Sequence, residues 1–373
     1  MPLQRGFDLP TRSVVPGPFP VVYSNGVGRH HDTALVKGPG VVTGRSGTIG
    51  RIHYVDGDYW PHNTTLWVTD FEHCLPKFTY YYLQHVGLER FAGGSGVPTL
   101  NRNDAHSLEI TIPGSLDEQA RIASVLTDAD DLIVTLEQML SKLRGIRRGT
   151  MQRLLTGRTR LPGFTGDWVP LRVASCSVLK ARIGWQGLTT AEYRASGTYR
   201  LVGGGEFVDG SVDWGATPFV DKWRYDQDPG IQLRPGDILL TKDGSIGKTA
   251  FVEGLPGPAT LNSGVFVIRP VRNSYDSQFL YFMLRSRAFK DFLGRLSAGS
   301  TIAHLYQRDL VGLVLDVPPA IEEQRAIAEV LRDMEAETAV LRRRLAKARL
   351  IKTGMMQELL TGRTRLPATE GAP

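Results

Sequence analysis

Two long stretches of the chain place apolar residues in alternating steps of three and four. Residues 117–155 and 322–360 contain no proline, and a spacing of about 3.5 residues is typical of a coiled coil rather than of a surface helix. The pattern predicts two long coiled-coil helices that begin just after Pro113 and Pro318. The main seam residues are Ile122, Leu126, Ile133, Leu136, Leu140 and Leu143 in the first helix and Ile327, Leu331, Met334, Leu341, Leu345 and Ile351 in the second.

Both predicted helices change from acidic to basic along the chain. Acidic side chains gather in 117–137 and 322–337, and basic side chains follow in 142–153 and 342–352. An antiparallel pair places each basic half against the acidic half of the other helix, and each helix complements its own dipole. Exposed ion pairs contribute about 0–1 kcal/mol each and a buried apolar side chain about 1.5–3 kcal/mol, so packing stabilises the pair and charge selects its direction. The alternative is two separate helices, each docked on its own domain.

The regions outside these helices carry short β-rich runs bounded by glycine and proline. We predict strands at 41–43, 51–54, 65–68, 238–241, 249–252 and 265–268. Residues 77–90 and 277–294 have apolar residues at helical spacing. Their aromatic residues, Tyr80–Tyr82 and Tyr281–Phe282, fit core packing better than base stacking. Each region therefore predicts an α+β domain.

The domains and helices form two copies of one unit. Residues 151–162 recur as 356–367 with eleven identities in twelve, at an offset of 205. The same offset aligns the predicted strand 108–113 with 313–318. A repeat of this kind determines the architecture. We expect an α+β fold in which two domains stand in a pseudo-twofold arrangement at opposite ends of antiparallel helices about 58 Å long.

These repeated motifs resemble those of the specificity (S) subunit of type I restriction–modification systems. The resemblance rests on the acidic-Glu-Gln starts of the helices at 117–119 and 322–324 and on the Met-Gln-x-Leu-Leu-Thr-Gly-Arg ends that begin at Met151 and Met356. It covers nearly the whole chain, with several motifs present twice in the same order. The boundaries that it implies are target-recognition domain one at 1–116, spacer helix one at 117–160, target-recognition domain two at 161–321, spacer helix two at 322–367 and a tail at 368–373.

The resemblance implies a non-catalytic subunit that reads a bipartite, gapped DNA site, one half per domain. It implies double-stranded DNA, modification (methyltransferase) subunits and restriction (motor nuclease) subunits as partners. No cofactor is implied on this chain, whereas AdoMet, ATP and Mg²⁺ are implied for the partner subunits. Two other classes stay open: a self-sufficient DNA methyltransferase or nuclease, and a protein-only adaptor with twin binding domains.

The first domain is shorter than the second on its N-terminal side. Forty-six residues precede Gly47, whereas eighty separate the end of the first repeat from the equivalent Gly244. The segment 164–171 that opens the second domain has no counterpart before Phe7. The comparison indicates a deficit of about thirty-four residues, which either a start codon assigned too late or a truncated or rearranged allele would explain.

Composition narrows the class of protein. A length of 373 residues with 41% hydrophobic and 22% charged residues excludes a disordered chain and a small disulfide-stapled fold. Cys74 and Cys176 lack metal-ligand spacing, and no apolar stretch is long enough to span a bilayer, so we expect a cytoplasmic protein without membrane or metal sites. Of the net charge of +6, the segments 117–160 and 322–365 carry +5. Any basic surface that faces DNA must therefore be local.

The sequence lacks the motifs of the common nucleases and adenine methyltransferases. None of the ten lysines has an acid two residues before it, as the common carboxylate–lysine nucleases require. Residues 316–320 lack the acid–proline junction and the aromatic residue of an adenine-methyltransferase loop. Residues 244–249 are similar to the end of a P-loop, but Lys242 stands where its first glycine would lie, which favours a hairpin turn.

Loops are the expected DNA-contact regions, because side chains reach from them into grooves and toward phosphates. The candidates in the first domain are Arg45, Thr48, Arg51 and Arg102. The candidates in the second domain are Lys242, Ser245, Lys248 and Arg308. For each of them, the alternative is a solvated turn residue without a ligand.

Overall fold

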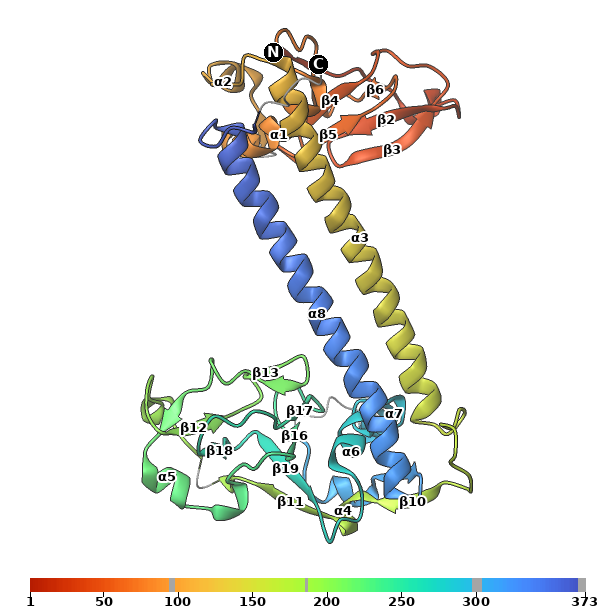
Figure 1. Ribbon diagram of the computed structural model, residues 1–373, viewed down its shortest axis with the longest axis vertical. Coiled ribbons are helices and arrows are strands. Elements are labelled where there is room, and N and C mark those ends of the chain that lie inside the picture. The colour runs from red at the N-terminus through yellow and green to blue at the C-terminus, as the bar shows by residue number, and fades with distance from the viewer. Residues whose placement is uncertain (94–97, 185–186, 297–303, 368–373) are drawn as a thin grey trace. The chain divides into compact units, whose positions relative to one another are not determined.

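The chain folds into two compact units. The computed structural model describes residues 1–93, 98–184, 187–296 and 304–367. Unit 1 comprises Met1–Met139 and Leu341–Pro373, and unit 2 comprises Leu140–Val340. Two long helices, α3 (Leu116–Leu154) and α8 (Ile321–Leu360), each contribute one part to each unit (Figure 1). Within the described part of the chain, no helix is both long enough and apolar enough to cross a membrane.

Unit 1 is built on an antiparallel four-stranded sheet in the order β1-β7-β4-β5. All residues of β4 are buried, because this strand lies between two neighbours and is covered on both faces. Helix α1 packs on β4 and β5 (Figure 1). A second sheet has the order β3-β2-β6, and β8 pairs with β9. The elements are β1 (Leu3–Arg5), β2 (Phe19–Tyr23), β3 (Gly26–His31), β4 (Gly40–Gly44), β5 (Ile52–Val55), β6 (Trp60–Pro61), β7 (Thr65–Val68), α1 (Pro76–Val86), β8 (Ala92–Gly93), β9 (Thr99–Leu100) and α2 (Arg102–His106).

Unit 2 repeats this plan with a larger sheet, in the order β11-β19-β16-β17-β14-β13. Sheets of order β15-β12-β18 and β10-β20 complete it, and α6 packs on β16 and β17. The elements are β10 (Val169–Arg172), α4 (Val173–Cys176), β11 (Ser177–Ala181), β12 (Tyr199–Val202), β13 (Phe207–Val208), β14 (Ser211–Val212), β15 (Phe219–Val220), α5 (Lys222–Asp226), β16 (Ile238–Thr241), β17 (Thr249–Phe251), β18 (Ala259–Leu261), β19 (Val265–Pro270), α6 (Ser277–Met283), α7 (Arg287–Leu296) and β20 (Val314–Val317).

The six strands predicted from the β-rich runs are all present, as β4, β5, β7, β16, β17 and β19. The predicted helix 77–90 ends early, because Gly87 adopts φ 69°, the left-handed conformation that commonly ends helices. The predicted helix 277–294 is divided into α6 and α7. Short-range hydrogen bonds tighten the last turn of α6, from Arg285 N to Phe282 O at 3.0 Å and from Ser286 N to Met283 O at 3.1 Å, and end the helix. The core placement of Tyr81, with 1% exposure, is confirmed.

The predicted strand at 108–113 is wrong, although its repeat partner forms β20. β20 exists by pairing with β10, in the register Leu171–Leu315. Among the described residues of unit 1, no strand corresponds to β10, and 108–113 therefore has no neighbour with which to form a ladder. A single strand without a partner gains no inter-strand hydrogen bonds, which is why two similar sequences give two different structures.

The two long helices run antiparallel within each unit. In unit 1, the acidic residues of α3 bind basic residues of α8 in reverse order, with Lys352 Nζ 2.6 Å from Asp130 Oδ1 and Arg349 Nη2 2.5 Å from Glu137 Oε1. In unit 2 the polarity is exchanged, and Arg147 Nη1 of α3 lies 2.8 Å from Glu335 Oε1 of α8. These pairs match the charge pattern, so the alternative of two unpaired helices is excluded.

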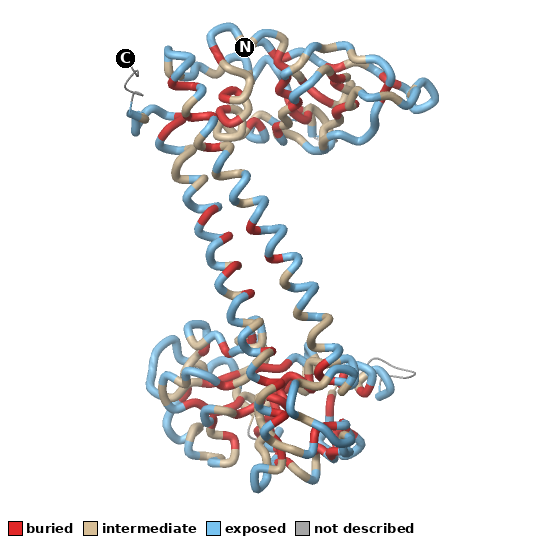
Figure 2. The backbone as a smooth tube through the Cα atoms, turned by 45° about the vertical axis from the view of Figure 1, so that its right-hand side comes forward, coloured by how far each residue is buried: buried red, intermediate tan, exposed pale blue. Residues whose placement is uncertain are grey.

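Burial along the helices follows a seam, and the buried residues of α8 alternate with exposed ones (Figure 2). Ile133, Leu143 and Met334 are partly buried. The buried seam residues are Ile122, Leu126, Leu136, Leu140, Ile327, Leu331, Leu341 and Leu345.

The placement of Ile351 in the seam is wrong. This residue is 50% exposed, and its repeat partner Ile146 is 49% exposed. The next residue takes the inward position in each helix, since the side chains of Lys352 and Arg147 are only 16% and 24% exposed. A straight α-helix repeats every 3.6 residues, so the inward face drifts relative to a strict heptad.

The repeated Glu-Gln pair at the start of each helix ties the helix to its unit. Gln324 Oε1 accepts a hydrogen bond from Asp276 N at 2.9 Å, and its Nε2 donates to Pro318 O at 2.8 Å. The preceding Glu323, 1% exposed, receives Arg160 Nη2 at 2.6 Å. In unit 1, Glu118 receives Arg365 Nη2 at the same 2.6 Å. Both repeated motifs are therefore explained by structure: the Arg after one helix holds the start of the other.

Candidate nucleic-acid interface

A hairpin and a later segment meet in unit 1 and bring basic side chains together. The β4–β5 hairpin turns through Gly47 and Gly50, with φ values of 82° and 73° that favour glycine. Its base is fixed to β9 and the residues that follow it, because Leu100 N, at the end of β9, donates to Arg45 O at 2.8 Å. Leu100 itself is 1% exposed and anchors this segment in the core.

The hairpin and this segment border a surface hollow of about 600 Å³. Among the described residues that line it are Arg5, Arg45 and Arg102, the amides of Asn101 and Asn103, and one acid, Asp104. Three guanidinium groups against one carboxylate suit an anionic ligand such as a phosphate, and amides can hydrogen-bond base edges. Two of the predicted residues, Arg45 and Arg102, thus lie in one place.

The other two candidates of this unit lie outside the hollow. Thr48 sits at the exposed tip of the hairpin, and Arg51 is exposed at its end. Arg5 was missed by sequence reasoning because it lies on β1, forty residues before the hairpin. Its Nη2 lies 3.5 Å from Asp8 Oδ1, a pair in which both side chains are more than half exposed.

Unit 2 repeats this construction with different side chains. Leu305 N donates to Lys242 O at 2.8 Å, which matches the bond between Leu100 and Arg45. Tyr306 is 47% exposed, and its ring centroid lies 4.3 Å from that of His304. The Arg308 guanidinium lies over the Tyr306 ring at 4.5 Å, and the Arg308 side chain is 79% exposed. An exposed aromatic ring stacked with a cation is suited to contact with bases or sugars.

The three hairpin candidates of unit 2 differ in how accessible their side chains are to a ligand. Ser245 is exposed at the turn. Lys248 Nζ donates to Gly204 O at 3.3 Å at the exposed edge of the hairpin. Lys242 is a correction, because its side chain is only 12% exposed and its Nζ lies 3.6 Å from Asp243 Oδ2. Its ammonium group is therefore paired within the protein and is less accessible to a ligand than the other two candidates.

His304 and Tyr306 were also missed by sequence reasoning. His304 pairs with Asp243 of the hairpin, through Nδ1 and Oδ1. The repeat itself could have indicated the loop sites of both units, since Leu100 aligns with Leu305 and Asp104 with Asp309. The residues between these matched positions differ between the copies, as expected for two sites of one design with different ligands. In the described ranges, no three His, Cys, Asp or Glu side chains are arranged to hold a metal ion.

A mixed α/β unit that occurs twice, with one basic loop site in each copy and a long helix after it, defines the class. Residues 18–143 and 186–349 match the family model described as the type I restriction modification DNA specificity domain, and the chain belongs to this family.

Relatives and solved structures carry similar descriptions. The chain is 27% identical to the type I restriction enzyme MjaVIII specificity subunit of Methanocaldococcus jannaschii, over 73% of this chain and 66% of that protein. It is 24% identical to the putative MjaX specificity subunit of the same organism, over 72% and 62%. The chain thus covers less than two thirds of the length of these curated relatives.

Two solved structures share the fold. The S subunit of a type I restriction–modification system from M. genitalium aligns with a TM-score of 0.68 at 17% identity, over 96% of this chain and 93% of that one. A chain from a study of complex assembly in the type I system aligns with a TM-score of 0.53 at 17% identity, over 97% and 95%.

Proposed function

We propose that this protein is the DNA-specificity subunit of a type I restriction–modification complex. It reads a bipartite, gapped DNA site, with one half bound by each unit. The observation that carries the proposal is the basic loop site that occurs once in each repeat, at the same hairpin, within a family of DNA-specificity domains. We place the recognition domains at 1–116 and 161–321 and the spacer helices at 117–160 and 322–367.

The side chains proposed to contact DNA in unit 1 are Arg45 and Arg102, with Arg5 and the Asn101 amide beside them. Arginine binds phosphates and guanine edges through two parallel hydrogen bonds, and asparagine does the same with adenine. Thr48 and Arg51 stay as outer contacts of the hairpin. In unit 2 the contacts are Ser245, Lys248 and Arg308, and Tyr306 supplies a stacking surface.

The chain is proposed to act as a scaffold rather than as an enzyme, in the cytoplasm. Modification subunits that use AdoMet would methylate the bound site, and restriction subunits that use ATP and Mg²⁺ would translocate and cleave DNA. The exposed apolar residues of α3 and α8, such as Leu132 at 52% and Leu350 at 74%, supply surface for these subunits.

The recognised sequence can be obtained by methylome sequencing of the host with and without this gene. We expect methylated adenines in a two-part motif with a fixed gap, present only when the gene is present. Binding of that duplex to the chain assembled with its modification subunits is then measured by electrophoretic mobility shift over a salt series. If the methylation that depends on this gene occurred at sites without a two-part motif, the proposal would be contradicted. Methylation or cleavage of DNA by the purified chain alone would also contradict it.

A further inference from the structure

A short turn beside each hairpin occupies an equivalent place in the two units. It follows the strand β6 that pairs parallel with β2 in unit 1, and the strand β18 that pairs parallel with β12 in unit 2. His62 N donates to Val22 O at 2.9 Å, and Asn262 N donates to Val202 O at 2.8 Å. The same backbone hydrogen bond therefore assigns His62 and Asn262 to one position of the repeat.

Both turns are held against their hairpins by a second equivalent bond. Arg45 N donates to Thr64 O at 2.8 Å in unit 1, and Lys242 N donates to Gly264 O at 2.9 Å in unit 2. Arg45 is one of the proposed DNA contacts and lines the basic hollow. The turn that carries His62 is therefore built next to a proposed DNA contact.

Polar contacts also connect this turn with the border of the hollow. Asn63 Nδ2 donates to Asp8 Oδ1. Arg5, which lines the hollow, places its Nη2 3.5 Å from the same oxygen, and the side chains of Arg5 and Asp8 are both more than half exposed. The turn and the hollow thus belong to one polar surface of unit 1.

The imidazole of His62 is held with its proton on Nε2. Thr64 N donates to His62 Nδ1 at 3.4 Å, and a backbone N–H can only donate, so Nδ1 is the acceptor. The Thr64 hydroxyl lies 3.1 Å from the same nitrogen and accepts from Ser24 N at 3.4 Å. Burial lowers the pKa of the His62 imidazole from its ordinary value, so the ring is uncharged at neutral pH. The Tyr23 ring packs beside it, with the centroids 4.4 Å apart.

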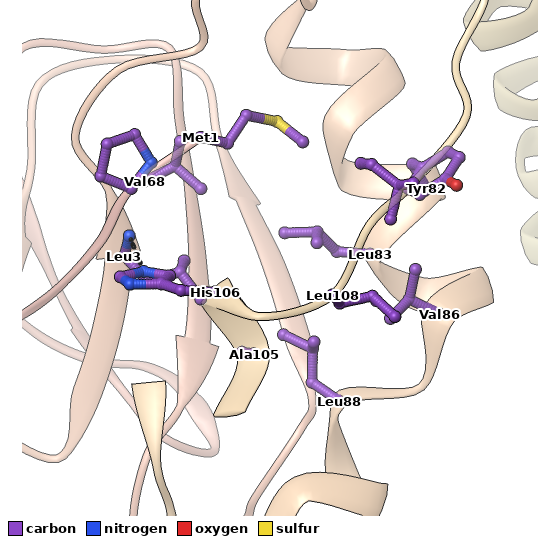
Figure 3. A pocket seen from close by; sticks show the side chains of 12 residues that line it. Met1, Leu3, Val68, Tyr82, Leu83, Val86, Leu88, Ala105, His106 and Leu108 are labelled. Carbon is purple, nitrogen blue, oxygen red and sulfur yellow. Dashed lines mark hydrogen bonds between the residues drawn. The ribbon is translucent and has the colours of Figure 1, made fainter. Parts of the chain in front are cut away.

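The other ring nitrogen of His62 is accessible to a ligand. In the described part of the chain, no hydrogen bond reaches Nε2, and His62 is not among the residues with a buried, unpaired polar atom. Two other histidines of unit 1 use this nitrogen internally. His106 Nε2 accepts from Leu3 N at 2.8 Å at the edge of an apolar cavity (Figure 3), and His53 Nε2 lies 3.2 Å from Ser24 O. His62 thus offers one N–H donor at the surface.

The equivalent residue of unit 2 is used differently. Asn262 Nδ2 donates to the Tyr193 hydroxyl at 2.7 Å, and Asn262 Oδ1 accepts from Ser263 N at 2.8 Å. Both polar atoms of this amide are therefore engaged within unit 2. Side chains that contact base edges specify the sequence, so a different side chain at one shared position is expected where the two halves of a DNA site differ.

We propose that His62 is a base-reading residue of unit 1, which donates a hydrogen bond from Nε2 to an acceptor atom on a base edge in the major groove. The acceptors there are guanine N7 and O6, adenine N7 and thymine O4, whereas cytosine presents a donor. His62 therefore disfavours cytosine at the base that it contacts. This assignment rests on the proposed reading of one half-site by unit 1, and it adds a residue that does not line the hollow.

The test compares the methylome motifs of hosts that carry the parent gene or a variant. Asparagine already occupies this position in unit 2, so His62→Asn should fold, but its short side chain does not extend to the place of Nε2. It should relax the motif at one base of the half read by unit 1 and leave the other half and the gap unchanged. Glutamine extends an amide N–H farther, so His62→Gln should retain the preference at that base. The control is His73→Leu, at an exposed residue before α1, which should leave the motif intact.

Binding of duplexes to the chain assembled with its modification subunits measures the size of the effect. The parent should bind a duplex with cytosine at that base about tenfold more weakly than the matched duplex. For His62→Asn the two duplexes should bind with nearly equal affinity.

The outcomes separate this assignment from the proposed function. A parent strain without a two-part motif would contradict the proposed function itself. If the parent gives such a motif and His62→Asn keeps it unchanged at the parent's melting temperature, the assignment of His62 is wrong while the proposed function stands. Equal relaxation by His62→Asn and His62→Gln would also overturn it, because the ring would then serve packing rather than donation. If His62→Asn melts lower than the parent, His62→Phe replaces it, since phenylalanine keeps a ring beside Tyr23 and lacks the donor.

Discussion

Single buried side chains at the helix starts join the parts of each unit. Gln119 repeats the bonds of Gln324, since its Oε1 accepts from Leu75 N at 2.8 Å and its Nε2 donates to Pro113 O at 2.9 Å. Both glutamines are buried, so water cannot replace their partners. The sequence repeat identified both glutamines as equivalent positions. Only the hydrogen bonds in the structure show that each glutamine links its helix to the loop before α1 or α6.

Replacement of Gln324 by alanine should destabilise the protein by about 1–3 kcal/mol, because Asp276 N and Pro318 O lose their partner in a buried place. Chemical denaturation followed by circular dichroism measures the change. The control is Gln152→Ala, an exposed position within α3 that should change stability little. Equal effects of the two substitutions would contradict the role of the buried glutamine.

The hairpin glycines of unit 1 also differ from each other in a testable way. Gly50→Ala should destabilise more than Gly47→Ala, although both residues have positive φ. A Cβ at Gly50 would lie 2.5 Å from the backbone N of Glu89, whereas at Gly47 it would lie 3.4 Å from a serine hydroxyl. Gly47→Ala should cost about 1–2 kcal/mol from the left-handed conformation alone. Thermal denaturation of both variants measures their melting temperatures, and we expect the lower value for Gly50→Ala.

At the scale of elements, the heptad pattern predicted both long helices and their direction but misplaced one inward residue. The pattern cannot reveal where a straight helix leaves a strict 3.5-residue repeat, since that depends on the helix geometry in the folded protein. Lys352 at the inward position is held by Asp130 and by the ring of Tyr81, whose centroid lies 5.4 Å from its Nζ. Two elements distant in sequence thus supply the environment that allows a charged residue there.

Leu345→Ala should therefore destabilise the protein by about 2–5 kcal/mol, because it removes a buried side chain from the helix pair. Ile351→Ala should cost less than about 0.5 kcal/mol, as expected for an exposed position. Urea denaturation of the two variants compares them directly. Similar losses would instead favour the strict heptad.

At the scale of the whole molecule, the two loop sites should act on separate halves of the DNA site. The double variant Arg45→Ala/Arg102→Ala should relax selectivity only in the half read by unit 1 and reduce the salt dependence of binding by about one counterion for each lost phosphate contact. Arg308→Ala should act only on the other half. Methylome motifs of strains carrying each variant show which half changes.

The control for these variants is Arg12→Ala, an exposed arginine of unit 1 that does not line the hollow. It should leave both halves of the motif intact. If a unit 1 variant altered both halves equally, the assignment of one half to each unit would be wrong.

The sequence by itself determined the repeat, the α+β composition of each copy, the two long helices and their antiparallel direction, because these follow from local periodicity and from charge order along the chain. The tertiary structure decided which side chains meet. It brought Arg5 to Arg45 and Arg102, paired Lys242 with Asp243, and left 108–113 without the partner that makes 314–317 a strand. Each of these outcomes depends on a neighbour distant in sequence, and a strand or a binding site exists only when that neighbour is present.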